Sequence, residues 1–279
     1  MRDVWFKIRG GLAVASACVT FGYAAAEPTA PIEDRLQIID SLDHPWPSIG
    51  RVNVAGYNRT SMCTGTLIDD RIVLTAAHCL FNAQTGQPHA LDDLRFVAGV
   101  RRDANSGLAH AACTWVHPEY TFTARPQLRD TRTDVALIVL KDALELPPVP
   151  VIRAETLAEV RRSTPVQSAG YRRSRRFLPT LDTDCRILGT VEGSWVTSCN
   201  TEQGASGGPL MIAQDGGWSV AGVMSAKIDA ARSVVVPFKQ WRDLINRNSC
   251  GGETGQRAKA AFDPARVPLR PSLDQIGTK

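Results

Sequence analysis

Three short stretches of the sequence carry side chains that could act together as a nucleophile and its base. "RIVLTAAHCL" brings an apolar run to His78, "TDVALIVL" places Asp134 directly before another, and "TEQGASGGPL" surrounds Ser206 with glycines. A serine hydroxyl is a poor nucleophile until a base removes its proton during attack, and a carboxylate can orient that base. Each stretch alone is a weak signal, but the three together favour nucleophilic catalysis.

Two of these positions have competing interpretations. Asp134 precedes a run that should be buried, where an unpaired carboxylate is costly, whereas Asp130 lies among polar residues and suits a solvent-facing role. Gly204 and Gly207 allow a tight bend, so Ser206 could be displayed on a turn as a nucleophile or could be a spacer in a surface loop. The rest of the sequence has to separate these alternatives.

Short apolar runs rich in β-branched residues make up most of the middle of the chain. The first set runs from "SIGRVNVAGY" to "VALIVL", the proline-rich "LPPVPVIR" follows, and a second set runs from "TPVQSAGY" to "SVVVPF". Many short strands at near-regular spacing predict an all-β sandwich or barrel. Near the end, "FKQWRDLINRN" predicts a helix, because one stripe holds Phe238, Trp241, Leu244 and Ile245.

The two ends of the chain differ in composition from its middle. Residues 1–26 combine a basic start, an apolar stretch and three final alanines, which predicts a secretory signal peptide cut after Ala26. Lipidation at Cys18 is an alternative, whereas a membrane anchor needs a longer apolar span. Residues 27–45 are expected to be a leader or N-terminal arm, and residues 251–279 a flexible tail. The net charge of +4 over 279 residues does not predict nucleic-acid binding.

Cysteine usage agrees with export. Removal of the signal peptide would leave an even set of cysteines, which predicts three disulfides in an oxidising compartment: Cys63, Cys79, Cys113, Cys185, Cys199 and Cys250. A metal site is the rival interpretation, but the sequence has no C-x-x-C or H-x-x-x-H spacing. We therefore expect a secreted or periplasmic protein with no metal and no organic cofactor.

The three motifs resemble those of a known family. "LTAAHC", "DVAL" and "GASGGPL" are similar, in the same order, to the catalytic motifs of the chymotrypsin-like (trypsin-like) serine peptidases, and the resemblance extends from Trp46 to Asn248. It implies an all-β fold of two six-stranded antiparallel β-barrels with a C-terminal helix. The first barrel would cover residues 46–150, the second with the helix residues 151–250, and the active site would lie between them.

The resemblance also implies roles for the site residues. His78 would be the general base, Asp134 would hold its tautomer, and Ser206 would form an acyl-enzyme. The backbone N–H groups of Gly204 and Ser206 would form the oxyanion hole. The implied function is a secreted, monomeric serine endopeptidase that acts on polypeptides. A non-catalytic binding or regulatory scaffold of the same fold is the alternative from another class, and an esterase on the same residues is a smaller one.

The resemblance suggests how the cysteines pair. Cys63–Cys79 matches the family's bridge beside the histidine loop. Cys185 and Cys199 flank a predicted hairpin and are expected to pair, which leaves Cys113–Cys250 by elimination.

Substrate selection is predicted from the same alignment. Asn200 would form the floor of the primary specificity pocket with Thr201 beside it, and neither attracts a charged side chain. The pocket wall and the edge that pairs with substrate would come from Met224, Ser225, Ala226 and Lys227. These residues predict a preference for uncharged, medium-sized side chains before the cut.

Two features depart from the family pattern or add to it. Ala205 stands where members activated by N-terminal insertion carry an aspartate, and the usual Ile-Val-Gly-Gly start is absent, which suggests the bacterial-type branch that folds directly into an active form. Arg161-Arg162 and "YRRSRR" (171–176) are basic stretches. A solvated loop is the simplest interpretation, and an exosite for acidic partners or a self-cleavage site are the alternatives.

Overall fold

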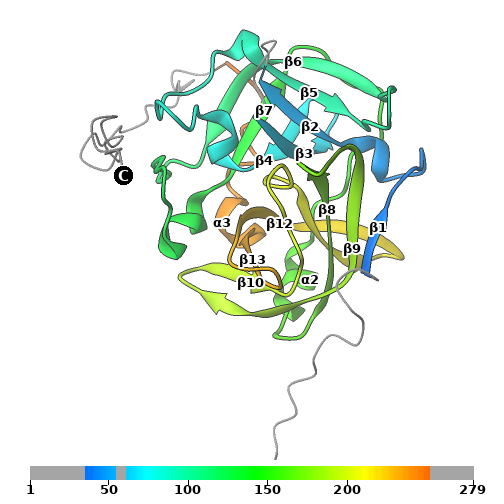
Figure 1. Cartoon of the computed structure of the whole chain (residues 1–279), viewed down its shortest axis with the longest axis vertical. Helices are drawn as coiled ribbons and strands as arrows, with labels where there is room; N and C mark the ends of the chain where they lie inside the picture. The colour runs from blue at the N-terminus through cyan, green and yellow to red at the C-terminus, as the bar shows by residue number, and fades with distance from the viewer. Residues whose placement is uncertain (1–34, 55–60, 252–279) are drawn as a thin grey trace, which may run out of the picture.

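The computed structural model describes residues 35–54 and 61–251. Two rounded β-structures lie against each other in Figure 1, with β2 to β7 in the upper one and β8 to β13 together with β1 in the lower one. The predicted signal peptide, the start of the predicted leader and nearly all of the predicted tail lie outside the described residues. No helix in the described ranges is long and apolar enough to cross a membrane.

The first structure is a closed antiparallel barrel with strand order β2-β3-β4-β7-β6-β5. Its strands are β2 (Ile49–Val54), β3 (Met62–Asp69), β4 (Ile72–Thr75), β5 (Leu94–Ala98), β6 (Gly107–Val116) and β7 (Ala136–Leu140). Strands β4 and β7 are buried at every residue, as their unbroken apolar runs predict. Strands β4 and β7 pair with each other. His78 comes shortly after the end of β4, and Asp134 comes shortly before the start of β7, so the barrel brings both residues to one end.

The second structure is a sheet of seven strands in the order β1-β9-β10-β13-β12-β11-β8, which the β8–β9 pairing closes into a ring. Its strands are β1 (Leu36–Ile38), β8 (Pro165–Arg172), β9 (Arg175–Val191), β10 (Ser194–Thr197), β11 (Pro209–Gln214), β12 (Gly217–Lys227) and β13 (Ser233–Pro237). A double barrel of the chymotrypsin type fits this arrangement. The strand β1 was not predicted: it comes from the segment expected to be a leader or arm and pairs with β9.

Helices are short throughout the described chain. They are the 3₁₀ turns η1 (Trp46–Ser48), η2 (Ala77–Leu80), η3 (Leu91–Asp93) and η4 (Leu128–Thr133), and the α-helices α2 (Ala154–Glu159) and α3 (Phe238–Trp241). The predicted C-terminal helix is therefore much shorter than its stripe suggested. Its continuation turns more tightly, because the Leu244 N–H donates to the Trp241 carbonyl and the Arg247 N–H to that of Leu244. Trp241 and Leu244 are nevertheless buried.

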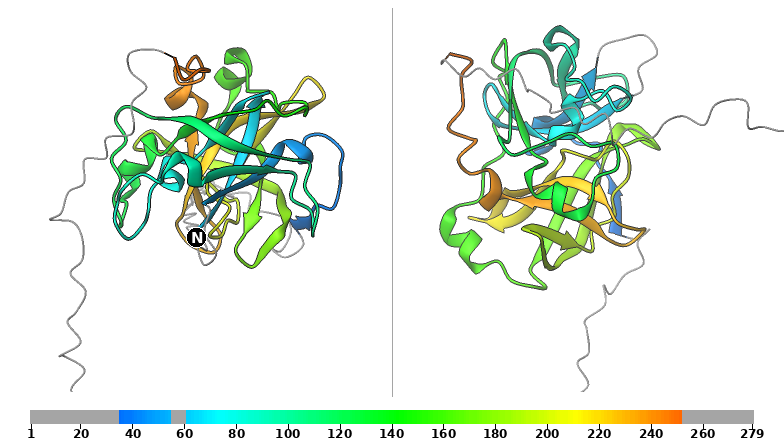
Figure 2. Two further views of the ribbon diagram at one scale, coloured as in Figure 1. Left: turned by 90° about the horizontal axis from the view of Figure 1, so that it is seen from above. Right: turned by 90° about the vertical axis from the view of Figure 1, so that its left-hand side faces the viewer.

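The three predicted disulfides are all present, joining Cys63–Cys79, Cys113–Cys250 and Cys185–Cys199. The second one ties the end of the chain to the first barrel, and the segment after α3 runs from the lower structure up to the top of the first barrel (Figure 2, right). Trp115 reinforces this tie, because its indole N–H donates to the Ser249 carbonyl and the Arg247 guanidinium lies 4.9 Å from its ring.

Candidate active site

His78 lies in η2, immediately after β4, where the chain leaves the barrel. Its imidazole Nδ1 is 2.8 Å from Asp134 Oδ2, and its backbone N–H donates to Asp134 Oδ1 at 2.8 Å. These two contacts fix both the ring and the backbone of the histidine. The carboxylate also requires that Nδ1 carries a proton, which leaves Nε2 as the free basic nitrogen.

Asp134 caps the end of η4 directly before β7 and is 6% exposed. A third donor reaches it from the second barrel, since the Ser225 hydroxyl donates to Oδ2 at 2.5 Å. Burial alone would raise the pKa of Asp134, but the charge and hydrogen bond of His78 and the hydroxyl of Ser225 outweigh burial and lower it. The buried carboxylate therefore stays ionised, as its predicted role requires.

Asp130, the alternative acid, has a different task. Its carboxylate accepts a hydrogen bond from the Gln127 backbone N–H at 2.8 Å, and the Gln127 side chain closes a capping box at the start of η4. The structure therefore joins His78 to Asp134 and uses Asp130 to hold the turn that presents Asp134.

The electrostatics of His78 follow from this pairing. Burial would lower the pKa of His78, but the negative charge and hydrogen bond of Asp134 raise it above its ordinary value. Burial together with the negative charge of Asp134 raises the pKa of the Tyr120 phenol. Tyr120 also packs on Phe81, with ring centroids 5.6 Å apart.

Ser206 lies on the glycine-rich turn between β10 and β11, and the turn requires its glycines. Gly207 has φ +83°, and a Cβ there would lie 2.2 Å from the Thr64 carbonyl oxygen. Thr64, on β3 of the first barrel, fixes the turn from the other side: its N–H donates to the Ser206 carbonyl at 2.8 Å, and its hydroxyl to the Gly204 carbonyl at 2.8 Å. The turn is thus held by both barrels.

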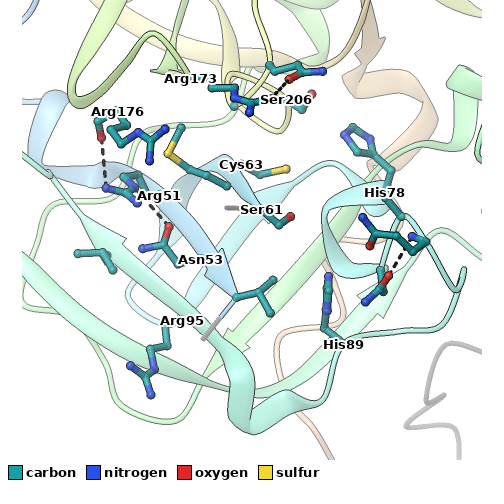
Figure 3. Close-up of a pocket in the computed structure, with 18 of the residues that line it drawn as sticks. Arg51, Asn53, Ser61, Cys63, His78, His89, Arg95, Arg173, Arg176 and Ser206 are labelled. Atoms are coloured by element: carbon teal, nitrogen blue, oxygen red, sulfur yellow. Dashed lines mark hydrogen bonds between the residues drawn. The ribbon is translucent and has the colours of Figure 1, made fainter. Parts of the chain in front are cut away.

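The Ser206 side chain borders the same pocket as His78 (Figure 3). Its hydroxyl donates to the Ser225 carbonyl at 3.4 Å, which is long for such a bond. Within the described residues it makes no hydrogen bond to His78 Nε2. Catalytic hydrogen bonds often tighten only when substrate is bound, so this geometry is compatible with the predicted pair.

The predicted oxyanion donors are the N–H groups of Gly204 and Ser206. Among the described residues neither N–H donates to a protein acceptor. Gly204 must be glycine here, because its φ is +96° and a Cβ would lie 2.6 Å from the Tyr171 carbonyl oxygen. Two unused donors beside the Ser206 hydroxyl are compatible with the predicted oxyanion hole.

The residues predicted to form the specificity pocket do not all face one space. The Asn200 side chain is already occupied: its Nδ2 donates to the Ala230 carbonyl at 2.7 Å, and its Oδ1 accepts from Arg172 at 2.6 Å. Arg172 belongs to the basic stretch 171–176, for which a solvated loop is the simplest interpretation of the sequence, but it lies at the end of β8, is buried and also donates to the Asn200 carbonyl. By contrast, the buried hydroxyl of Thr201 has no hydrogen-bond partner in the described chain.

The predicted pocket wall on β12 is also divided. Met224 and Ser225 are buried, whereas Ala226 is half-buried and Lys227 is exposed. The Met224 carbonyl accepts from the Gly207 N–H at 2.7 Å, so the backbone of Met224 supports the glycine-rich turn that carries Ser206. Ser225, predicted as wall, contacts Asp134 instead, a contact that only the fold reveals.

A cavity of about 1090 Å³ opens beside Ser206 and His78. None of the residues predicted to form the specificity pocket lines it. Its lining comes from β2, β3, β5 and β6 of the first barrel, from the segment that follows η2, and from the β8–β9 hairpin, and it includes Gly204. Figure 3 shows the side chains of Arg51, Arg95, Arg173 and Arg176 around one side of this cavity and His78 on the other.

One grouping of metal-binding residue types occurs in the described chain. Ligand atoms of Cys63, His78 and Cys79 lie within 4.8 Å of one another. Metal ions bind the thiolate form of cysteine, and both sulfurs are joined in a disulfide, so this group is unsuited to hold a metal.

Comparison with known proteins bears on the family of this chain. A sequence model of the family described as Trypsin matches residues 40–245, which is most of the chain. The serine proteinase stubble of Drosophila melanogaster is 26% identical over 236 residues, covering 68% of this chain. The match spans 27% of that relative, so this chain is similar to about a quarter of it.

Proposed function

The chain belongs to the trypsin family, and we propose that it is a serine endopeptidase that cuts polypeptides through an acyl-enzyme on Ser206. The observation that carries the proposal is the pairing of His78 Nδ1 with the ionised, buried Asp134 at 2.8 Å. His78 and Ser206 line the same cavity. A scaffold that had lost turnover would have no need to keep a buried carboxylate under a partly exposed histidine.

The proposed reaction uses Nε2 of His78 as the base. The Ser206 hydroxyl turns from the Ser225 carbonyl toward Nε2, loses its proton to it and attacks the scissile carbonyl carbon. The tetrahedral intermediate collapses when the protonated His78 returns that proton to the leaving amine, and the C–N bond breaks. Water then attacks the acyl-enzyme by the same route, and Ser206 is regenerated as the acid product leaves.

Asp134 and the backbone supply the electrostatic part of this reaction. The carboxylate stabilises the imidazolium that forms during each proton transfer, and its hydrogen bond to Nδ1 keeps Nε2 facing the substrate. The N–H groups of Gly204 and Ser206 would bind the oxyanion, in a site where the surrounding backbone is already fixed. No metal or organic cofactor takes part in this scheme.

Before the cut, we propose selection for uncharged, medium-sized side chains. The support is the neutrality of Asn200 and the unpartnered buried hydroxyl of Thr201, which could accept or donate one hydrogen bond to substrate. Since the Asn200 side chain is held by Arg172 and Ala230, we assign it a supporting role and give the polar contact to Thr201. Ala226 and Lys227 lie on the accessible end of β12 and would pair with substrate backbone.

We further propose that the enzyme is exported, monomeric and active without N-terminal insertion, as in the bacterial-type branch of the superfamily. Ala205 is buried, and Gly170 packs against it so closely that a Cβ on Gly170 would lie 3.0 Å from the Ala205 side chain. The larger, charged side chain of an activating aspartate would not fit there without rearrangement. Export is supported by the composition of residues 1–26 and by three disulfides.

The test is cleavage of a diverse peptide library by the chain that starts at Glu27, with products identified by mass spectrometry. We expect endoproteolytic cuts after neutral side chains and none by Ser206→Ala, which should fold with an unchanged melting temperature. Cuts mainly after Arg or Lys would show that the pocket assignment is wrong. Hydrolysis of esters without any peptide cleavage, or peptide cleavage that survives Ser206→Ala, would overturn the proposed function.

A further inference from the structure

The cavity beside Ser206 has an unbalanced charge. Four arginines line it, namely Arg51, Arg95, Arg173 and Arg176, and none of its described lining residues is an aspartate or glutamate. In the described chain, no carboxylate lies within ion-pair distance of any of the four guanidinium groups. Each guanidinium remains charged at any pH at which a protein folds, so the cavity carries a concentrated positive charge.

Several arginines elsewhere on the described surface have a carboxylate partner. Arg101 and Arg102 both pair with Asp40, and Arg153 pairs with Asp215. Glu202, the acid nearest in sequence to Ser206, accepts hydrogen bonds from Ser174 and does not line the cavity. Single arginines without a carboxylate partner, such as Arg71 and Arg161, also occur elsewhere in the described chain. What distinguishes the cavity is that four arginines gather in it and no described carboxylate lines it.

Two of these arginines, Arg51 and Arg173, are held in position by uncharged groups. Arg51 donates to Asn53 Oδ1 and to the Arg176 carbonyl, both at 3.2 Å, and Arg173 donates to Gln203 Oε1 at 3.1 Å. Burial is the main cause that lowers the pKa of Arg51, and the positive charge of Arg176 lowers it further.

Arg95 has an open hydrogen-bond donor. Its buried Nε has no hydrogen-bond partner among the described residues. A buried donor without an acceptor is costly, and an anionic ligand would supply one.

The position of the cavity identifies which part of a substrate enters it. The residues proposed to select the side chain before the cut, Thr201 and Ala226, lie outside its lining, whereas His78 and Ser206 border it. In the proposed reaction His78 gives its proton to the leaving amine, so the chain that follows the cut begins beside His78. That chain can continue only away from the acyl half, which leads it into the cavity.

We propose that this cavity receives the leaving-group side of the substrate and that its arginines select aspartate or glutamate within the first few residues after the cut. The proposal rests on the proposed peptidase function and refines its substrate class. Guanidinium groups bind carboxylates through paired hydrogen bonds, which favours a short, well-placed acid over diffuse negative charge.

The experiment compares quenched fluorescent peptides with one acyl half and different leaving halves. Each of the first three positions after the cut carries Glu, Gln or Lys in turn, and kcat/KM is measured at low and high salt. We expect Glu to exceed Gln by about fivefold to tenfold at one or more positions, because each exposed ion pair contributes modestly. Lys should be worse than Gln, and both differences should shrink at high salt.

Variants locate the effect. Arg173 and Arg176 are exposed, so Arg173→Gln and Arg176→Gln should leave folding and cleavage of the Gln peptide unchanged while they reduce the Glu preference by about threefold each. Arg175 lies on the same hairpin, is exposed and does not line the cavity, so Arg175→Gln is the matched control and should retain the preference.

The outcomes separate this proposal from the proposed function. Equal cleavage of Glu and Gln peptides, or a Glu preference that Arg175→Gln weakens as much as Arg176→Gln does, would overturn the proposal while the peptidase stands. Inhibition by a sulfated polysaccharide together with indifference to Glu would assign the arginines to a polyanion and also overturn it. A wild-type chain that cleaves none of the peptides would overturn both.

Discussion

Two aspartates, one in each half of the molecule, are buried, and different partners stabilise their carboxylates. Asp134, at the edge of the first barrel, is 6% exposed, and Asp182, on β9 of the second sheet, is fully buried. Asp134 faces His78, whose charge depends on pH, whereas Asp182 faces Arg35, whose charge is permanent. Each aspartate also reaches a backbone N–H, that of His78 or of Asn200.

The hydrogen bonds explain why the two carboxyls differ. Both oxygens of Asp134 accept short bonds, from the His78 backbone, the His78 ring and the Ser225 hydroxyl, and the pKa of Asp134 is lowered. The donors to Asp182 converge on Oδ2, Arg35 is 3.5 Å away, and Oδ1 has no partner in the described chain. Burial therefore dominates at Asp182 and raises its pKa, with the Asn200 N–H and Arg35 offsetting only part of it.

Burial by itself therefore does not identify an active site. A carboxylate that is fully bonded and paired with a titratable base can support proton transfer, while one that is partly bonded to a fixed cation can only join two segments. Arg35 also donates to the carbonyls of Asp184 and Ser198, so we interpret the Asp182 region as the anchor of the N-terminal strand β1 (Leu36–Ile38).

The largest expected effect is at Asp134. Asp134→Asn keeps the shape but favours the wrong tautomer of His78, so kcat/KM should fall on the order of 10⁴-fold with the fold intact. Asp130→Asn is the control, since Asp130 caps η4 and should cost only cap stability, about 1 kcal/mol. Peptidase kinetics on both variants check this, and a damaging Asp130→Asn beside a harmless Asp134→Asn would reverse the assignment.

The second effect is on stability and belongs to Asp182. Arg35→Met leaves a buried carboxylate unpaired, so unfolding free energy should drop by about 3–5 kcal/mol at neutral pH, measured in urea. Removal of the cation raises the pKa of Asp182 further, so the loss should fade as pH falls and the carboxyl takes up a proton.

A matched control variant tests whether the Arg35–Asp182 pair has a structural role. Arg153→Met removes an exposed pair with Asp215 and should change stability by about 1 kcal/mol or less. Folded Arg35→Met enzyme should keep its kcat/KM. If it lost turnover while its stability stayed normal, the Asp182 region would belong to the active site and the contrast would fail.

A third, smaller effect concerns the donor that only Asp134 has. Ser225→Ala removes one hydrogen bond to a charged group, about 1.5–3 kcal/mol, so kcat/KM should fall by about tenfold to a hundredfold. Ser219, buried on the same strand β12 and bonded to Gln214, provides the control: Ser219→Ala should affect stability alone. Equal kinetic losses in the two variants would remove Ser225 from the account.

The smallest effect is a shift in pH dependence. His78 must be neutral to accept the serine proton, so kcat/KM should fall about tenfold per pH unit below the His78 pKa, which Asp134 raises above its ordinary value. In Asp134→Asn, burial still lowers the pKa of His78 but the negative charge that raises it is gone. The midpoint of the pH profile should therefore move to lower pH. A midpoint that stays in place would show that Asp134 does not set the charge state of His78.

The contrast also shows what the sequence could and could not predict. The sequence shows the short motifs that contain His78, Asp134 and Ser206, because each has a local pattern, either the end of an apolar strand or a glycine-rich turn. The strands and the cysteines are visible in the same way. Arg35 and Asp182 are 147 residues apart, and nothing near either one indicates the other. The Ser225–Asp134 contact and the Arg172–Asn200 contact are likewise products of the fold.

Short elements escaped prediction for a related reason. The strand β1 has three residues, too few to show an alternating pattern, and its partner β9 determines it. The stripe from Phe238 to Ile245 indicated burial correctly but not helix length, because apolar spacing does not distinguish an α-helix from successive tight turns.

The most direct test of the central claim is covalent labelling by a serine-reactive phosphonate probe, followed by peptide mapping. The account predicts one label, on Ser206, in the chain that starts at Glu27 without any prior proteolytic cut. Labelling should be much slower in His78→Ala and Asp134→Asn and unchanged in folded Arg35→Met. Absence of a label on Ser206, or a label that forms as fast without His78 as with it, would contradict the account.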